Sequence, residues 1–168
     1  TLTARWTPKP ENKYVVEHYQ QNVSGESTLV ETEVLVDAAG SAVTPETKVY
    51  AGFDAPEQQT ETIAPDGSLV IKYYYMPSPY SVSWNNGERY TVKVERTASP
   101  NANAAIVTIT NGSTVYYGDE LLVTYTPHDG YKITTAATET LVVTGDVPAS
   151  KITAKAEKNE YIVIYYAN

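Results

Sequence analysis

Acid–base chemistry is within reach of two histidines in this 168-residue chain, His18 and His128. His128 precedes Asp129, and an imidazole beside a carboxylate can act as an oriented general base. Neighbouring side chains in a turn point apart, however, and no serine lies in the Gly-x-Ser-x-Gly context of a nucleophile elbow. His18 lies inside a strand-like run. We therefore expect no catalytic residue.

Paired carboxylates are the next candidates for chemistry. Glu31 and Glu33 are two residues apart, so they share one face of a strand, and we favour a solvated acidic face over an acid–base pair. Asp119, Glu120 and Asp129 are isolated turn acids without calcium-ligand spacing. The absence of cysteine excludes disulfides, thiol catalysis and thiolate metal sites. We expect no metal site, no cofactor and no enzymatic activity.

Aromatic side chains are candidates for ligand contact. Trp84, Tyr116 and Tyr117 lie beside turns, where an exposed ring can stack on a sugar. For Trp84, which precedes the turn Asn85-Asn86-Gly87, we favour packing within a hairpin.

Composition limits the partners and the fold class. Lys and Arg total 12 against 20 Asp and Glu, a net charge of −8 that disfavours nucleic acid and anionic membrane surfaces. No apolar run approaches the roughly 18–20 residues of a membrane span. The chain has 15 Tyr but only 1 Phe and 2 Trp, and Tyr favours half-buried pleated surfaces. We expect a mainly β protein.

Period-two hydrophobic patterns predict the strands of the first half. The Asp66-Gly67 turn predicts that residues 60–63 and 69–75 pair as a hairpin. The second of these runs is apolar on both faces, as a central strand would be. Thr44-Pro45-Glu46 predicts one short helix, near Thr44 to Lys48. The predicted strands are residues 13–23, 29–36, 57–63 and 69–76.

Pro77-Ser78-Pro79 interrupts this pattern, so we place a domain boundary there. Beyond it, residues 80–84 and 89–96 are predicted to form a hairpin through Asn85-Asn86-Gly87. The spacing of strands and turns indicates a small antiparallel sheet or sandwich. Its further predicted strands are residues 105–110, 121–126, 138–144, 151–156 and 161–166.

The two ends of the chain echo each other. Residues 2–5 and 152–155 are apolar-Thr-Ala-basic tetrads, and each is followed by an Asn and then a strand-like run, residues 14–19 and 161–166. A third, similar run starts at Arg89, so the chain has the pattern of a modular array. We expect residues 161–166 to be buried in the second module's sheet, or alternatively to open a further module. The short Pro-rich junction predicts modules that lie end to end.

The stretch from YVVEHYQQ to SLVIKYYY resembles the mucin-binding-protein-like and internalin B repeat group. The resemblance rests on an opening strand ending in His-Tyr, a Thr/Glu-rich strand, a Val-Thr short helix, a Tyr-x-Gly-Phe turn and a Tyr-rich Asp-Gly hairpin. TLTARW is similar to the closing strand of a Listeria–Bacteroides repeat. Tyr117-Gly118-Asp119 and Gly130-Tyr131 are more weakly similar to a bacterial surface repeat domain.

The resemblance implies a β-grasp-like module, in which a small sheet curls round a short helix, at residues 11–77. Residues 1–10 would be the tail of a preceding module and a linker, and residues 78–168 a second all-β or β-grasp-like repeat. It also raises the possibility of a Lys–Asn isopeptide cross-link at Lys72, which lies in the predicted central strand, residues 69–76.

The function implied is a non-enzymatic stalk or adhesive repeat of a secreted or wall-anchored bacterial surface protein. The expected partners are host mucin, glycoprotein or glycan and neighbouring modules of the same chain, and we expect a monomer. The alternative is a carbohydrate-binding module attached to an extracellular enzyme. A coplanar row of exposed aromatic rings would favour the alternative, and scattered tyrosines would favour a spacer.

Overall fold

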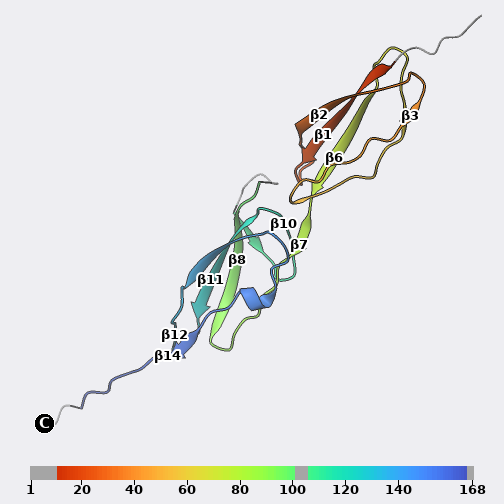
Figure 1. Cartoon of the computed structure of the whole chain (residues 1–168). Helices are drawn as coiled ribbons and strands as arrows, with labels where there is room; N and C mark the ends of the chain where they lie inside the picture. The colour runs from red at the N-terminus through yellow and green to blue at the C-terminus, as the bar shows by residue number, and fades with distance from the viewer. Residues whose placement is uncertain (1–10, 101–105, 166–168) are drawn as a thin grey trace, which may run out of the picture. The chain divides into compact units, whose positions relative to one another are not determined.

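The computed structural model describes residues 11–100 and 106–165, so the tail assigned to residues 1–10 lies outside the described residues. The chain is mainly β, as predicted. It folds as two compact units, Thr1–Ser78 (unit 1) and Pro79–Asn168 (unit 2), and each has its own hydrophobic core (Figure 1). No helix among the described residues is long and apolar enough to cross a membrane.

Unit 1 is built on a four-stranded sheet with the order β2-β1-β6-β4. β1 and β2 form an antiparallel pair, whereas β6 runs parallel to β1 and antiparallel to β4. β3 and β5 pair separately. The strands are β1 (Asn12–Gln21), β2 (Ser27–Asp37), β3 (Ala42–Val43), β4 (Phe53–Asp54), β5 (Glu61–Thr62) and β6 (Val70–Pro77).

One face of this sheet carries the core of unit 1. Because side chains alternate along a strand, every second residue of β6 is buried and its neighbours are exposed. β6 is a central strand, as predicted, but only one of its faces is covered. The buried core residues are Tyr14, Val16, Val43, Ile63, Ile71, Tyr73 and Tyr75.

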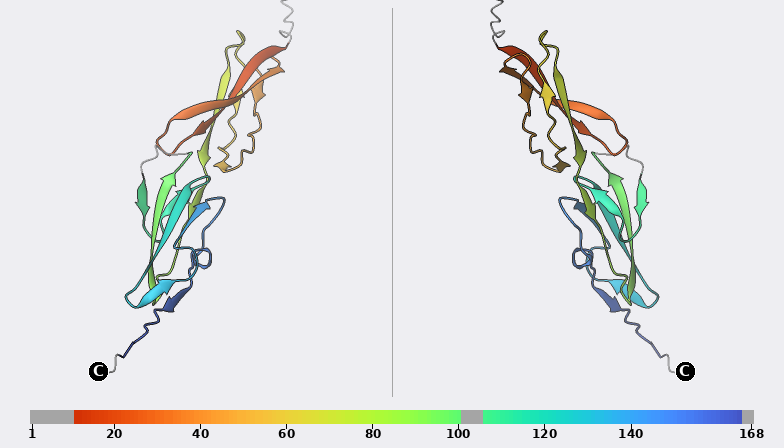
Figure 2. Two further views of the ribbon diagram at one scale, coloured as in Figure 1. Left: turned by 90° about the vertical axis from the view of Figure 1, so that its left-hand side faces the viewer. Right: turned by 90° about the vertical axis from the view of Figure 1, so that its right-hand side faces the viewer.

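The connection from β2 to β6 crosses the buried face of the sheet (Figure 2), as a link to a parallel strand requires. The short helix predicted near Thr44 to Lys48 is wrong, because this segment is irregular. Tyr73 donates a hydrogen bond to the Pro45 carbonyl (2.8 Å), and the Lys48 N–H donates to the Tyr75 hydroxyl (2.8 Å). The backbone groups of this segment are thus hydrogen-bonded by β6 side chains instead of by a helical ladder.

The hairpin predicted around Asp66-Gly67 is also wrong. The turn itself forms, and Gly67 has the positive φ of 75° that the turn needs. However, β5 pairs with β3, while both edges of β6 are taken by β1 and β4. Long-range pairing has displaced the local pairing that the turn signal indicated.

Unit 2 contains a four-stranded antiparallel sheet with the order β13-β11-β8-β9 and two further strand pairs, β7 with β10 and β12 with β14. One 3-10 turn, η1 (Ala149–Lys151), precedes β14. The strands are β7 (Pro79–Ser81), β8 (Tyr90–Ala98), β9 (Val107–Ile109), β10 (Thr114–Tyr116), β11 (Glu120–Pro127), β12 (Tyr131–Ile133), β13 (Thr138–Val142) and β14 (Ala156–Lys158).

The hairpin predicted through Asn85-Asn86-Gly87 does not form, because β7 pairs with β10 and β8 pairs with β9 and β11. The Asn111 side chain satisfies both backbone groups of Trp84, accepting from its N–H (3.0 Å) and donating to its carbonyl (2.7 Å). The Asn86 side chain accepts from the Val92 N–H (2.9 Å). Side-chain amides therefore take the place of a strand ladder here.

Two C-terminal strand predictions are wrong. Residues 151–156 form η1 and an irregular segment, with β14 starting only at Ala156. Residues 161–165, which we expected to be buried, form no strand, and their side chains are 67–90% exposed. Residue 166 lies outside the described residues. Unit 2 completes its core without this run.

Gly118 provides a test of the turn before β11. Its φ is +82°, and a Cβ at this position would lie 2.7 Å from Pro100 Cγ, whereas Gly112 has a φ of +85° and open space around it. We expect Gly112→Ala to lose roughly 1–2 kcal/mol of unfolding free energy from backbone strain alone. Gly118→Ala should lose more, because it adds a steric clash. Urea denaturation measures both; equal losses would contradict this reading.

Candidate functional site

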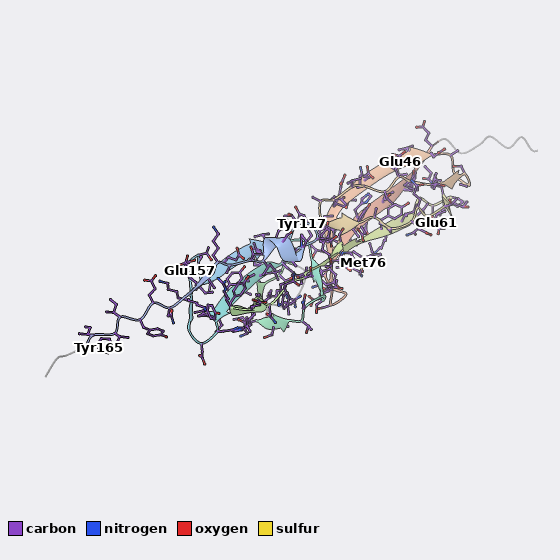
Figure 3. The ribbon with its side chains drawn as sticks, turned by 90° about the horizontal axis from the view of Figure 1, so that it is seen from below. Glu46, Glu61, Met76, Tyr117, Glu157 and Tyr165 are labelled. Atoms are coloured by element: carbon purple, nitrogen blue, oxygen red, sulfur yellow. The ribbon has the colours of Figure 1, made fainter. Side chains whose placement is uncertain are left out.

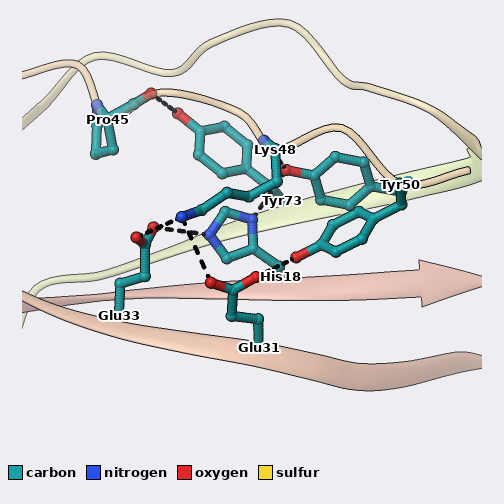
Figure 4. Close-up of polar contacts among 8 residues, drawn as sticks. His18, Glu31, Glu33, Pro45, Lys48, Tyr50 and Tyr73 are labelled. Atoms are coloured by element: carbon teal, nitrogen blue, oxygen red, sulfur yellow. Dashed lines mark hydrogen bonds and ion pairs between the residues drawn. The ribbon is translucent and has the colours of Figure 1, made fainter.

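His18 lies on the buried face of unit 1 and is itself fully buried (0% exposed). Its Nδ1 lies 2.9 Å from the Tyr75 hydroxyl, and its Nε2 lies 3.1 Å from Glu33 Oε2 (Figure 4). β1 positions the imidazole between β2, which supplies Glu33, and β6, which supplies Tyr75.

The partners of His18 define its tautomer. An ionised Glu33 can only accept, so Nε2 carries the proton and donates to it. When the ring is neutral, Nδ1 accepts from the Tyr75 hydroxyl, whose oxygen accepts from the Lys48 N–H. In this series of hydrogen bonds, from Glu33 through His18 and Tyr75 to the Lys48 N–H, each donor faces an acceptor. Both nitrogens of the imidazole are therefore engaged in hydrogen bonds within unit 1.

Lys48 joins the two carboxylates of β2. Its Nζ lies 2.7 Å from Glu33 Oε1 and 3.4 Å from Glu31 Oε1, and Tyr50 donates a hydrogen bond to Glu31 Oε2 (2.8 Å). The shared face of Glu31 and Glu33 is confirmed, but it is not simply a solvated acidic face, because Lys48 and Tyr50 from the crossover cover it. Strand periodicity could not indicate these partners, because they come from an irregular segment.

These contacts shift the titration of the cluster. The hydrogen bond from Lys48 lowers the pKa of Glu33 below its ordinary value, and the Tyr50 hydroxyl lowers that of Glu31. Hydrogen bonding to Glu33 raises the pKa of Lys48, and burial followed by the Glu31 hydrogen bond raises that of Tyr50. The cluster is thus stabilised in its ionised form, with both carboxylates negative and the lysine positive.

The cluster is suited to fastening the crossover to the sheet. Its histidine, both carboxylates and lysine are hydrogen-bonded to one another or to tyrosine hydroxyls. No group of three or more side chains suited to holding a metal ion occurs in residues 11–100 and 106–165.

His128 is exposed, and its Nδ1 donates to the Glu88 carbonyl (3.0 Å). The imidazole is thereby directed at a backbone oxygen. The structure gives it no hydrogen bond to Asp129 in the part of the chain it describes, so it does not assemble the dyad that the sequence offered.

The aromatic candidates are not brought together on an open surface. Trp84 is only 7% exposed and packs in the core of unit 2, so its ring offers no face to a sugar. It packs in a core, although not in the hairpin we predicted. Tyr116 and Tyr117 are half-buried beside the β10–β11 turn.

Lys72 points away from the core, with its side chain 47% exposed and its Nζ 3.4 Å from Glu17 Oε2. An isopeptide bond assisted by a buried acid is therefore not supported at this lysine. Lys72 lies instead beside a pair of tyrosines that the sequence analysis did not single out. The Tyr19 and Tyr74 rings stack with centroids 5.2 Å apart and planes 22° apart, and Lys72 Nζ lies 5.5 Å from the Tyr19 centroid.

The open face of unit 1, as we call it, is formed by the outward-facing residues Glu17, Tyr19, Lys72, Tyr74 and Met76. Tyr74 and Met76 are 40% and 46% exposed. Aromatic rings beside charged groups are suited to contacting sugars. However, Tyr19 and Tyr74 stack on each other, which leaves only their outer surfaces free, and they do not form the coplanar row that a dedicated sugar platform would show.

A cavity of about 500 Å³ lies in unit 2 between the start of β8 and the segment leading into β14. Arg89 spans it, donating to the Ala156 carbonyl (2.9 Å), and the Tyr90 hydroxyl accepts from the Ala154 N–H (3.2 Å). Gly87 packs directly against the Tyr90 ring, where an added Cβ would lie 3.0 Å away. The Tyr90 ring beside this cavity is thus half-buried.

No protein-family model matches the chain, and a search of curated proteins finds no match.

Tyr75→Phe tests the hydrogen-bonded chain through His18. The change removes one hydroxyl and leaves a buried imidazole nitrogen and a backbone N–H without partners, so we expect a loss of roughly 1–3 kcal/mol of unfolding free energy. Tyr74→Phe is the matched control, because it makes the same change at the next residue, on the open face. Chemical denaturation followed by tyrosine fluorescence measures both. If Tyr75→Phe left the free energy of unfolding unchanged, the cluster would have no structural role.

Acid should weaken unit 1 through the carboxylates of β2. Because their folded-state pKa values are lowered, their stabilisation is present above the ordinary value of 4.5 and is lost as the pH falls through the folded values. Glu33→Gln should cost about 0.5–1 kcal/mol at pH 7, a modest loss because Lys48 and Glu33 are partly exposed.

The difference between wild type and Glu33→Gln should shrink as the pH is lowered below 4.5. Denaturation midpoints across this range, with the exposed Glu61→Gln as the control, measure it. A difference that stays constant with pH would contradict the assignment.

Proposed function

We propose that this chain is a non-enzymatic stalk or adhesive repeat segment of a secreted or wall-anchored bacterial surface protein. One observation carries the proposal. The residues best suited to acid–base chemistry, His18, Glu31, Glu33 and Lys48, are bound to one another and to tyrosine hydroxyls, and together they hold an irregular crossover on a sheet. Their role is thus to maintain a shape, as a spacer requires.

The topology of unit 1 supports a β-grasp-like module. An antiparallel β1–β2 pair, a crossover over one face and a β6 parallel to β1 make a mixed sheet that grasps the intervening segment. The segment held is irregular chain, with the Pro45 carbonyl and the Lys48 N–H bound by tyrosines where the family resemblance implied a short helix. For unit 2 we propose a second small antiparallel module of the same protein.

Host glycoprotein or mucin glycan is the external partner we propose, and the open face of unit 1 is the surface that suits it best. The stacked Tyr19–Tyr74 pair beside Lys72 and Glu17 combines apolar area with hydrogen-bonding groups. The alternative, a carbohydrate-binding module attached to an extracellular enzyme, would use the same face, although the stacked pair is not the coplanar row of rings that would favour it. The end-to-end order of the modules, based on Pro77-Ser78-Pro79, stays a prediction.

A mucin and glycan array with the purified chain tests the proposal and its alternative. We expect weak binding to mucin glycans from wild type, and no hydrolysis of glycosidic, peptide or ester substrates. Tight binding to one glycan that Tyr74→Ala abolishes and Met76→Ala retains would favour the dedicated binding module. The two variants change neighbouring side chains of similar exposure on the same face. Turnover lost on His128→Ala would overturn the non-enzymatic proposal.

A further inference from the structure

Residues 161–165, YIVIY, form an apolar run without a packing partner in the described part of unit 2. Figure 3 shows the run extending from β14 with Tyr165 near its far end and no strand beside it. Its five side chains are 67–90% exposed. A short, uncharged β-prone segment of this kind, with neither Pro nor Gly, readily pairs with other strands, so leaving it in water is unfavourable.

The sequence of this run matches the first strand of unit 1. Aligning Asn159 with Asn12 places Tyr161 on Tyr14, Val163 on Val16 and Tyr166 on Tyr19. In β1 the inward-facing buried residues are Tyr14, Val16 and His18, at 6%, 0% and 0% exposure. The two stretches therefore share two of the three residues that β1 buries, and Tyr165 takes the place of the third, His18.

The outward-facing positions of the run are apolar too, which indicates a strand that is covered on both faces. Ile162 and Ile164 take the places of Val15 and Glu17, which lie on the outer face of β1. Since β1 already lies between β2 and β6, a strand of its type has a neighbour on each edge. The two isoleucines make the outer face apolar as well.

We infer that residues 161–165 are a β1-type strand that completes the sheet of another β-grasp-like module in the same polypeptide. This inference rests on the modular function proposed above and names the module's point of attachment. The corresponding position in unit 1 is filled by β1, which pairs with β2 along its whole length and with β6 over the residues Val15 to Gln20. Because unit 1 already contains its own β1, residues 161–165 would have to pair with another module's sheet, one in which the position of β1 is empty.

A graft tests the inference directly. In this variant a second copy of residues 20–78 follows Tyr166, so that residues 159–166 stand where residues 12–19 stand in unit 1. We expect the amides of residues 161–165, open to solvent in the parent chain, to exchange at least about a hundredfold more slowly in the graft. Hydrogen–deuterium exchange with mass spectrometry measures this. Replacing two of the inward residues, Tyr161→Lys with Val163→Lys, should abolish the protection, and the outward change Ile162→Thr should retain it.

Two further measurements keep the test decisive. If the first graft gains no protection, Ile164→Glu with Tyr165→His restores the charged and hydrogen-bonding residues of β1, and absence of protection there too would overturn the inference. Light scattering of the parent chain, against a version ending at Asn159, should show monomers in both cases. A dimer that the truncation abolishes would instead make a second copy of the chain the partner. Neither negative result would bear on the spacer function, which the glycan and hydrolysis assays test separately.

Discussion

The hydrogen bonds from the tyrosines of β6 to the crossover backbone are the interaction on which unit 1 depends. A parallel β1–β6 pair requires a long connection, and this one carries polar backbone groups over a buried sheet face without a helix to satisfy them. The Tyr73 hydroxyl donates to the Pro45 carbonyl and accepts from the Gln59 N–H (3.2 Å), so a single side chain holds two distant points of the crossover. The Tyr75 hydroxyl joins a third point to His18. At positions 73 and 75 tyrosine therefore does what phenylalanine could not, because the ring fills the core while its hydroxyl replaces a ladder hydrogen bond.

In unit 2, short polar side chains provide the hydrogen bonds that the backbone of irregular segments requires. Asp119 is fully buried, its Oδ2 accepts from the Tyr116 N–H (3.0 Å), and the Asp119 backbone is bonded to Val143. Asp146 accepts from both the backbone and the side chain of Ser81. Asn and Asp side chains so placed close turns and bind irregular segments to the strands. Both units therefore contain irregular chain that is fixed by specific hydrogen bonds.

The sequence predicted three long strands well. At residues 13–23 and 69–76 the period-two pattern reflects burial on one sheet face. In residues 29–36 the strand forms, but its valines are exposed and its less exposed face carries Glu31, Glu33 and Leu35. It failed where a local signal competed with a distant partner. The turn at Asp66-Gly67 forms without its hairpin, since β6 gains more partners between β1 and β4. For the candidate site, alternation placed Glu31 and Glu33 on one face, but no local rule connects them to Lys48. The stacking of Tyr19 on Tyr74 depends on the parallel register, which sequence periodicity does not define.

The parallel pairing of β1 with β6 also has a mechanical meaning. Among the described residues of unit 1, β1 is the first strand and β6 the last, so tension applied along the polypeptide pulls these two neighbouring strands in opposite directions along their length. The register from Val15 opposite Val70 to Gln20 opposite Tyr75 is then loaded in shear, and its hydrogen bonds share the force and do not open one at a time. Because forced unfolding is governed by the unfolding barrier and not by equilibrium stability, such a geometry resists extension even in a small unit. In the spacer function proposed above, this resistance to stretching would keep the folded length of the chain constant.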